Sequence, residues 1–461
     1  MSEAVSINPA TGKILQKYER ITSAQAEALV AKTRERFAEW KHLPFAQRDA
    51  FMYEVAQVLE KDKQAYATLI TNEMGKTYAA AVAEIEKCAL VCRYFAGNAE
   101  QFLKQQTVAT EAQESFVTFD PLGTVLAIMP WNFPFYQAIR FAAPALMAGN
   151  TAVLKHASNV QGCAHAIEAL FVKAGLPENV FTNLNISSND MEALISNKNI
   201  AAVTLTGSGA AGKSVAATAG KHLKKCVLEL GGSDAYIITG SVDLNKAVKL
   251  CVKARLQNNG QTCIAAKRFI VEEKIYDAFL EKFTDAMQQA KMGDPFDEAS
   301  FYGPMAREDL RSELHQQVQE SIDQGAVLTT GGFIPQMQGA YYPATVLADV
   351  KPRMVAFDEE LFGPVAAVIK AKNVEEAIAL ANDSEFGLGA AVLTGDIDSA
   401  RKTASHHIEA GNVFINAIVA SDPRLPFGGI KSSGFGRELS AYGIKEFVNI
   451  KTVWIESEIK I

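Results

Sequence analysis

From about residue 122 onward, short β-rich runs alternate with helical segments, and this alternation constrains the fold more than any other feature. Strand candidates include Val125–Met129, Thr151–Leu154 and Ala202–Leu205, and helical segments such as Val160–Ala174 lie between them. Such alternation is typical of parallel sheets, because a parallel crossover needs a connection of helix length. A second series, with runs such as Val365–Ile369, continues towards residue 425. The sequence therefore predicts an α/β fold with two sheet-containing domains.

The two ends of the chain show other patterns. Residues 22–105 repeat polar and apolar residues at helical spacing, which predicts a largely helical region. Near the C-terminus, Val448–Glu456 alternates Val, Ile and Trp with Lys and Thr, which predicts a strand. A terminal strand of this kind is suited to pairing across a subunit boundary.

Composition excludes several classes of function. The net charge of -7 gives no basic surface for nucleic acid. Apolar runs are too short to span a membrane, and the first residues lack the charged and apolar regions of a signal peptide. The six cysteines have no paired spacing, and Cys88 and Cys92 lack two further metal ligands nearby. We expect a cytoplasmic protein with free thiols, no metal, and no membrane or nucleic-acid partner.

A glycine pattern suggests a dinucleotide site. Gly207–Gly212 matches G-x-G-x-x-G, follows a predicted strand and opens a predicted helix. A literal interpretation assigns Glu229, 22 residues after Gly207, to the ribose of the cofactor. The alternative is a turn of small residues that packs a helix on a strand, and the pattern alone leaves both open.

Three other segments place reactive side chains next to turns. Cys263 ends Asn259–Cys263, Glu229 begins Glu229–Gly232, and Asn132 lies between two prolines in Pro130–Pro134. Taken singly, each has an ordinary explanation: a buried small thiol, a surface glutamate or a turn asparagine.

Together, these segments resemble the signatures of the NAD(P)-dependent aldehyde dehydrogenase superfamily. They occur in the same order, and the 34-residue interval between Glu229 and Cys263 is also similar. Further similar segments extend the resemblance over nearly the whole chain: Asn8–Gly12, Glu73–Lys76, Glu359–Pro364 and Pro426–Glu438.

The resemblance implies a catalytic sequence on three residues. The Cys263 thiolate attacks the aldehyde, and the oxyanion of the resulting thiohemiacetal accepts hydrogen bonds from the Asn132 side chain and the Cys263 backbone N–H. Hydride transfer leaves a thioester. Glu229 is then the general base that activates water and helps to deprotonate the thiol. A carboxyl group desolvated in a cleft has a raised pKa, which suits this role. The ribose role of Glu229 is therefore rejected.

The resemblance also implies that NAD or NADP is the cofactor. Its expected contacts are Trp131, Lys155, Ser158, Gly207, Ser208, Glu360 and Phe362. Many NAD-using relatives have a glutamate where this chain has Ser158. In those relatives the glutamate bonds the 2′-hydroxyl, and it would repel a 2′-phosphate by charge and fail to bond it. A serine does neither, so NAD is expected to be favoured and NADP tolerated. His156, in place of the usual proline, is interpreted as a packing variation.

The substrate is expected to be an aldehyde that carries a carboxylate. The chain most resembles succinate semialdehyde dehydrogenases, in which an arginine at the position of Arg140 grips the distal carboxylate. Ser421 matches a second carboxylate contact, and Gln257 replaces a second arginine found in some members. The structural alternative for Arg140 is an ion pair with an acidic side chain.

The resemblance implies three parts and a homo-oligomer, either a dimer or a tetramer. These are a Rossmann-like cofactor domain (1–105 and 125–230), an α/β catalytic domain (231–425), and a small β oligomerisation element with the tail (106–124 and 426–461). Alternative functions are oxidation of another small aliphatic aldehyde, or thioester transfer to CoA or phosphate. A non-enzymatic member would be expected to lack one of the three catalytic residues. A Rossmann dehydrogenase with a Tyr–Lys pair is disfavoured, because Leu280 follows Tyr276 where that pair needs lysine.

Overall fold

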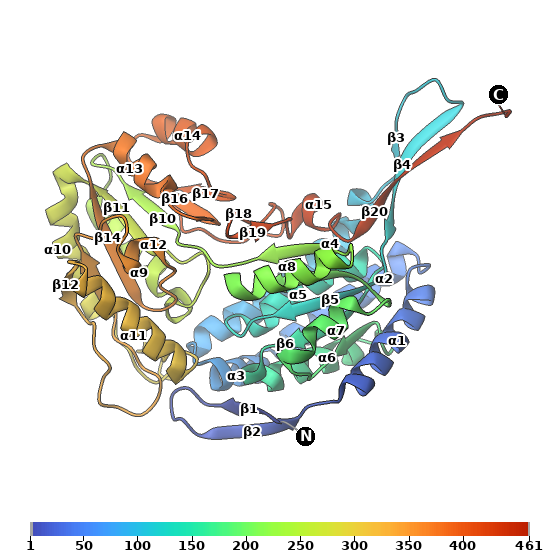
Figure 1. The fold of residues 1–461 in the computed structure, drawn as a ribbon, viewed down its shortest axis with the longest axis horizontal. Helices are drawn as coiled ribbons and strands as arrows, with labels where there is room; N and C mark the ends of the chain where they lie inside the picture. Colours follow the sequence, from blue (N-terminus) through green and yellow to red (C-terminus); the bar gives the residue numbers. More distant parts are fainter. Residues whose placement is uncertain (1–2, 460–461) are drawn as a thin grey trace.

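The computed structural model describes residues 3–459, so the predicted domain ends at 1–2 and 460–461 lie outside it. Two large sheets lie side by side, each with helices on its faces (Figure 1). This arrangement confirms the predicted α/β class.

The first sheet is parallel except at one edge. Its strand order is β19-β9-β8-β5-β6-β7, and only β19 runs antiparallel to its neighbour. Its central strands β5, β6 and β8 consist mainly of buried residues, most of them apolar, as expected for a parallel sheet covered on both faces. The strands are β5 (Thr124–Met129), β6 (Thr151–His156), β7 (Phe181–Asn183), β8 (Ile200–Thr206), β9 (Lys225–Glu229) and β19 (Gly434–Phe435).

Helices cover both faces of this sheet. Helices α1, α7 and α8 pack on one face, and α5 and α6, backed by α2–α4, pack on the other. The predicted helical region 22–105 is confirmed as four consecutive helices. The bounds are α1 (Ser23–Trp40), α2 (Phe45–Lys61), α3 (Lys63–Met74), α4 (Tyr78–Phe102), α5 (Pro134–Met147), α6 (Gln161–Lys173), α7 (Met191–Ser196) and α8 (Gly209–Lys221).

The second sheet has the order β12-β13-β14-β11-β10-β16-β17, with only β12 antiparallel. The chain passes from the first sheet to the second between Glu229 and Ala235. The strands are β10 (Ala235–Ile238), β11 (Arg268–Glu272), β12 (Val327–Thr330), β13 (Thr345–Ala348), β14 (Val365–Ala371), β16 (Gly389–Leu393) and β17 (Asn412–Ile415). The helices are α9 (Leu244–Leu256), α10 (Glu273–Gln289), α11 (Glu308–Asp323), α12 (Val355–Asp358), α13 (Val374–Asn382) and α14 (Ile397–His406).

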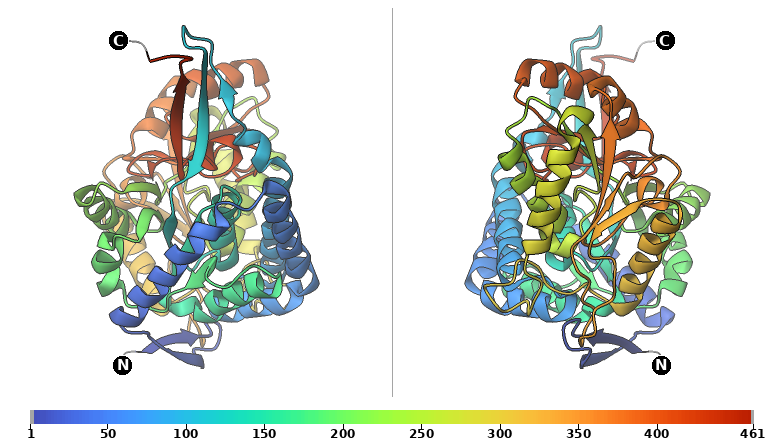
Figure 2. Two further views of the ribbon diagram at one scale, coloured as in Figure 1. Left: turned by 90° about the vertical axis from the view of Figure 1, so that its right-hand side faces the viewer. Right: turned by 90° about the vertical axis from the view of Figure 1, so that its left-hand side faces the viewer.

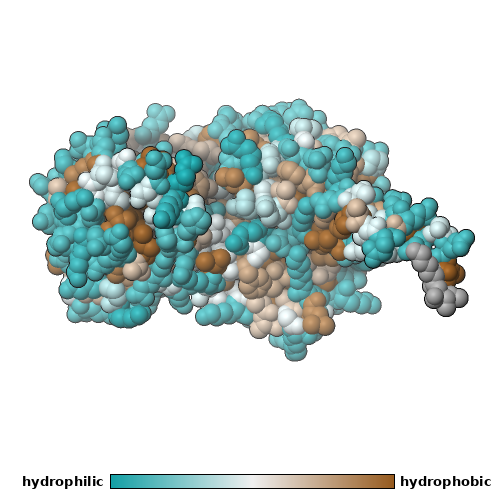
Figure 3. Space-filling view, turned by 90° about the horizontal axis from the view of Figure 1, so that it is seen from above, coloured by the Kyte–Doolittle hydropathy of each residue, from teal (hydrophilic) through white to brown (hydrophobic). Residues whose placement is uncertain are grey.

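A three-stranded antiparallel arm projects from the body (Figures 2 and 3). It consists of β3 (Gln106–Thr107), β4 (Glu114–Pro121) and β20 (Val448–Ile455). The predicted C-terminal strand is therefore confirmed, and it exposes the large apolar side chains of Ile450 and Trp454.

Small elements complete the described chain. The N-terminal hairpin pairs β1 (Glu3–Ile7) with β2 (Ile14–Glu19), and β15 (Phe386–Gly387) pairs with β18 (Ile430–Lys431). One-turn helices occur at Ser158–Val160, Ser188–Asp190 and α15 (Ser440–Gly443), and Gln257–Gly260 forms a turn with left-handed backbone at Asn258 and Asn259. Within residues 3–459, no helix has both the length and the apolar content needed to cross a bilayer. The domain boundaries themselves stay a prediction.

Candidate active site

The parallel sheet gathers three of the predicted segments at one edge. Asn132 follows β5, Gly207 and Ser208 follow β8, and Glu229 is the last residue of β9. Because β5, β8 and β9 are parallel neighbours, their carboxyl ends lie together, which is where ligands bind in open α/β sheets.

Cys263 lies on a tightly held loop between α9 and β11. Three consecutive residues before it, Asn258, Asn259 and Gly260, have positive φ angles of 53°, 58° and 74°. At Gly260 a Cβ would lie 2.4 Å from the carbonyl carbon of Gly363, so only glycine fits. The Asn259 side chain stabilises the turn by donating to the carbonyl oxygens of Gly75 (2.9 Å) and Pro304 (2.8 Å).

Hydrogen bonds tie the Asn132 segment to the Cys263 loop. Asn258 Nδ2 donates to the Asn132 carbonyl at 2.9 Å, and Asn132 Nδ2 donates to the Gln261 carbonyl at 3.0 Å. The second N–H of the Asn132 amide is not used by that bond. The amide is therefore held beside the loop with donor capacity remaining.

Two cavities of about 240 Å³ each meet at the thiol, and both are lined by Cys263 and Gln137. The first lies among α4, α5 and the segment 419–421, and its lining includes Lys87, Tyr136, Arg140, Gln257, Ser421 and Phe427. The second lies at the sheet edge, and its lining includes Trp131, Asn132, Gly207, Ser208, Glu229, Glu360 and Phe362. Two molecules bound in these cavities would approach the sulfur from different sides.

Burial controls the protonation of both reactive groups. It raises the pKa of the Cys263 thiol to about 12, although the nearby positive charges of Lys267 and Arg140 act in the opposite direction. Burial is the main cause that raises the pKa of Glu229 well above its ordinary value, and the negative charge of Glu438 acts in the same direction. Neither carboxyl oxygen of Glu229 has a hydrogen-bond partner in the described chain. Burial therefore favours the protonated form of both groups.

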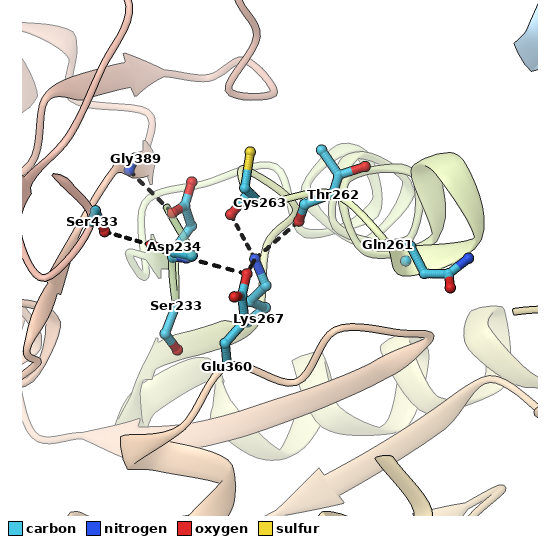
Figure 4. Close-up of polar contacts among 12 residues, drawn as sticks. Ser233, Asp234, Gln261, Thr262, Cys263, Lys267, Glu360, Gly389 and Ser433 are labelled. Atoms are coloured by element: carbon cyan, nitrogen blue, oxygen red, sulfur yellow. Dashed lines mark hydrogen bonds and ion pairs between the residues drawn. The ribbon is translucent and has the colours of Figure 1, made fainter. Parts of the chain in front are cut away.

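A buried lysine connects the thiol loop to the second cavity (Figure 4). Lys267 Nζ donates to the carbonyl oxygens of Thr262 (3.0 Å) and Cys263 (2.6 Å), and it pairs with Glu360 Oε1 at 3.0 Å. Glu360 Oε1 also accepts from the Gly232 N–H at 3.2 Å. Lys267 therefore fixes the backbone of Cys263 relative to the Glu360 carboxylate, which lines the second cavity.

Most of the predicted cofactor residues line the second cavity. The rings of Trp131 and Phe362 meet edge to face, 5.7 Å between centroids. Ser208 caps α8 by accepting from the Ala211 N–H at 3.3 Å, and a Cβ at Gly209 would meet nothing within 4 Å. The N-terminus of α8 thus faces open space, which suits an anionic group.

Lys155 and Ser158 do not line this cavity. They lie at and just after the end of β6, where burial lowers the pKa of Lys155. Ser158 is exposed and borders a separate cavity of about 420 Å³. His156 between them is buried, with its ring 2.9 Å from the Pro134 carbonyl and its pKa lowered to about 4 by burial. A neutral, hydrogen-bonded ring agrees with the packing interpretation.

The surroundings of Arg140 are compatible with both roles that the sequence left open, contact with the substrate and an ion pair with an acidic side chain. It lines the first cavity with Gln257 and Ser421, and it also forms a buried ion pair with Glu438. Its guanidinium lies over the Phe427 ring, 4.9 Å from the centroid.

The residues near the site that were not predicted include Lys87 and Tyr136 in the first cavity, Gln137 in both cavities, and Lys267 and Glu438 as ion-pair partners. Glu438 ends the Pro426–Glu438 segment, but nothing in the sequence marks it as a partner of Arg140. Lys87 lies three residues after Glu84 on a predicted helix, where a solvated charge is the usual interpretation. No group of three or more metal-ligating side chains occurs among residues 3–459.

A model of the aldehyde dehydrogenase family matches residues 2–453. The chain is 49% identical to a probable NADP-dependent succinate-semialdehyde dehydrogenase of Synechocystis sp., over 98% of this chain and 99% of the relative. It is 48% identical to an NAD(P)-dependent succinate semialdehyde dehydrogenase of Escherichia coli, over 98% of both chains. A crystal structure of succinic semialdehyde dehydrogenase from Streptococcus pyogenes with NADP⁺ superposes with a TM-score of 0.96 at 36% identity, covering 98% of this chain and 100% of that one.

Proposed function

The chain belongs to the aldehyde dehydrogenase family and is an aldehyde dehydrogenase; from this premise we propose that it oxidises succinate semialdehyde to succinate with NAD or NADP. The observation that carries the proposal is the pair of cavities that meet at Cys263. One has cations and hydroxyl groups among its lining residues, and the other has aromatic rings and an open helix N-terminus.

The second cavity fits a nicotinamide cofactor. The space at Gly209 and the N-terminus of α8 suit a pyrophosphate, and Trp131 and Phe362 provide flat apolar contacts for a ring. Glu360 is proposed to bind the nicotinamide ribose, with Gly207 and Ser208 near the phosphates. When bound, the cofactor supplies the acceptor for the hydride that leaves the substrate.

The remaining steps are proposed for side chains and backbone groups of this chain. The Glu229 carboxylate takes the thiol proton of Cys263 and later releases it to solvent, and the thiolate attacks the aldehyde carbon. The free N–H of the Asn132 amide and the Cys263 backbone N–H donate to the oxygen that becomes negative. Once the carbon is oxidised to a thioester, Glu229 removes a proton from the attacking water, and Cys263 leaves as the thiolate. The raised pKa of Glu229 suits a group that accepts a proton and releases it.

Cofactor choice rests on Ser158 and on the relatives. From the uncharged Ser158 we expect the enzyme to favour NAD and to tolerate NADP. The relative of Synechocystis sp. is named for NADP and that of Escherichia coli for NAD(P), which supports use of the phosphorylated cofactor. Lys155, three residues before Ser158 in the chain, is proposed to attract the 2′-phosphate.

The test is a panel of aldehydes, each with NAD and with NADP, followed by absorbance of the reduced cofactor. We expect succinate semialdehyde to give a higher kcat/KM than butanal, an uncharged aldehyde of the same chain length. Added CoA should leave the rate unchanged, because Glu229 is proposed to activate water for hydrolysis of the thioester. A rate that depends on CoA would support the acylating alternative. Equal kcat/KM for the two aldehydes would refute the choice of substrate.

The exposed strand β20 supports a homo-oligomer. Its outer residues include Ile450 and Trp454, whose burial against a second copy would offset their exposure. A cytoplasmic location is part of the same proposal, supported by six free cysteines.

A further inference from the structure

Among the charged residues that line the first cavity, Lys87 is the one without an ion-pair partner in the described part of the chain. Three charged side chains line this cavity: Glu84, Lys87 and Arg140. Glu84 pairs with Lys76 at 2.5 Å, and Arg140 pairs with Glu438. Among the residues that the structure describes, Lys87 makes no ion pair.

The surroundings of Lys87 suit an anion. Its ammonium group donates to Ser421 Oγ at 2.8 Å, and the Tyr136 hydroxyl lies 2.8 Å from the same oxygen. Lys87 Nζ also lies 4.5 Å from the centre of the Tyr136 ring. One ammonium and two hydroxyl groups therefore converge in the cavity that also contains the thiol. The nearby carboxylate of Asp422 is bound by Arg424, at 2.8 Å and 2.7 Å.

We propose that Lys87, together with the hydroxyl groups of Ser421 and Tyr136, binds the distal carboxylate of the substrate. This inference rests on the proposed function, and it revises the expected role of Arg140. Arg140 Nη2 is paired with Glu438, so in this proposal Arg140 contributes positive charge near the subsite and Lys87 makes the direct contact. A bound carboxylate would also give the buried Lys87 ammonium group the negatively charged partner that it lacks in the free enzyme.

The first test compares two substitutions at Lys87. Lys87→Met removes the charge and keeps the length of the side chain, and Lys87→Arg keeps the charge. For Lys87→Met we expect kcat/KM with succinate semialdehyde to fall about 10- to 100-fold, the range typical of one charge-assisted hydrogen bond. We expect kcat/KM with butanal to stay unchanged, and Lys87→Arg to recover much of the loss. Lys61→Met, at the exposed end of α2, removes the same charge away from the cavity and should change neither rate.

The outcomes separate this inference from the proposed function. If the wild-type enzyme does not prefer succinate semialdehyde to butanal, the proposed function is wrong. If the wild type has this preference and Lys87→Met keeps it, the role of Lys87 is wrong. If Lys87→Met lowers both rates equally, Lys87 has only a structural role, and the inference is again wrong.

A pH profile of the wild-type enzyme provides a second measurement. Burial is the main cause that lowers the pKa of Lys87, to about 8, and the positive charge of Arg140 acts in the same direction. The titratable or charged groups around it are Glu84, Cys88, Tyr136, Arg140 and Asp422. Since kcat/KM reports ionisation in the free enzyme, the preference for succinate semialdehyde over butanal should decline as the pH rises through about 8. Dividing the two rates cancels titrations that both substrates share, such as that of Glu229. A ratio that does not change between about pH 6.5 and about pH 9.5 would contradict the proposal.

Discussion

Replacing Arg140 by methionine tests whether this arginine is bound by Glu438. Both side chains are buried, with 3% and 6% of their surfaces exposed, so solvent does little to replace the lost partner. Removing one member of a buried ion pair typically costs about 3–5 kcal/mol, because the remaining charge is left without a partner. In Arg140→Met, Glu438 can avoid this cost only by taking up a proton.

The size of the loss then depends on pH. Burial already raises the pKa of Glu438, and Arg140 opposes this effect, so the variant should have a still higher pKa. A carboxyl whose pKa is higher in the folded state than in the unfolded state destabilises the fold increasingly as the pH rises above the unfolded value, about 4.3. Each pH unit adds about 1.4 kcal/mol, which gives at most about 1 kcal/mol at pH 5 and about 4 kcal/mol at pH 7.5.

Urea titration followed by tryptophan fluorescence, at both pH values, measures this loss against the wild type. The double variant Arg140→Met, Glu438→Leu is the control, and it should recover most of the stability at the higher pH because no unpaired charge remains. A single variant as stable as the wild type at pH 7.5, or equally destabilised at both pH values, would refute the ion-pair interpretation.

Three further predictions concern the proposed machinery. The hydrolysis of the thioester should speed up as the pH rises through the raised pKa of Glu229, since only the ionised carboxylate accepts a proton. Glu229→Gln should abolish this pH dependence and slow turnover by about 10²- to 10⁴-fold, which stopped-flow measurements would show. Lys267→Met should shift alkylation of Cys263 by iodoacetamide to higher pH, because the lysine charge partly opposes the effect of burial on the thiol pKa; an unshifted alkylation profile would contradict this. Ser158→Glu should lower kcat/KM with NADP at least about tenfold and leave NAD use intact or improved, since a carboxylate repels the 2′-phosphate; equal effects on both cofactors would exclude the role of Ser158.

The sequence was sufficient for features that depend on local pattern or motif order. The strand run that ends at Met129 and the terminal strand from Val448 follow directly from side-chain periodicity. The parallel sheet then brings the segments of Asn132 and Glu229 to one edge, as the topology requires.

Contacts between distant segments could not be predicted in this way. The pair of Arg140 with Glu438 joins residues far apart in the chain, as does the bond of Lys87 to Ser421. Lys267 looks like an ordinary residue before a strand, and only the folded loop brings it to Glu360. Sequence periodicity shows which face of an element is buried, but it does not show which polar groups meet there.

The most direct test of the central claim is to trap the acyl-enzyme on Cys263. Glu229→Gln is mixed with succinate semialdehyde and NADP, quenched with acid, digested, and analysed by mass spectrometry of the six cysteine-containing sites. We expect a succinyl thioester on Cys263, together with about one equivalent of reduced cofactor per active site, because oxidation continues while hydrolysis is slowed. Formation of reduced cofactor without a thioester on Cys263, or a thioester on a different cysteine, would contradict the assignment of Cys263 as the nucleophile.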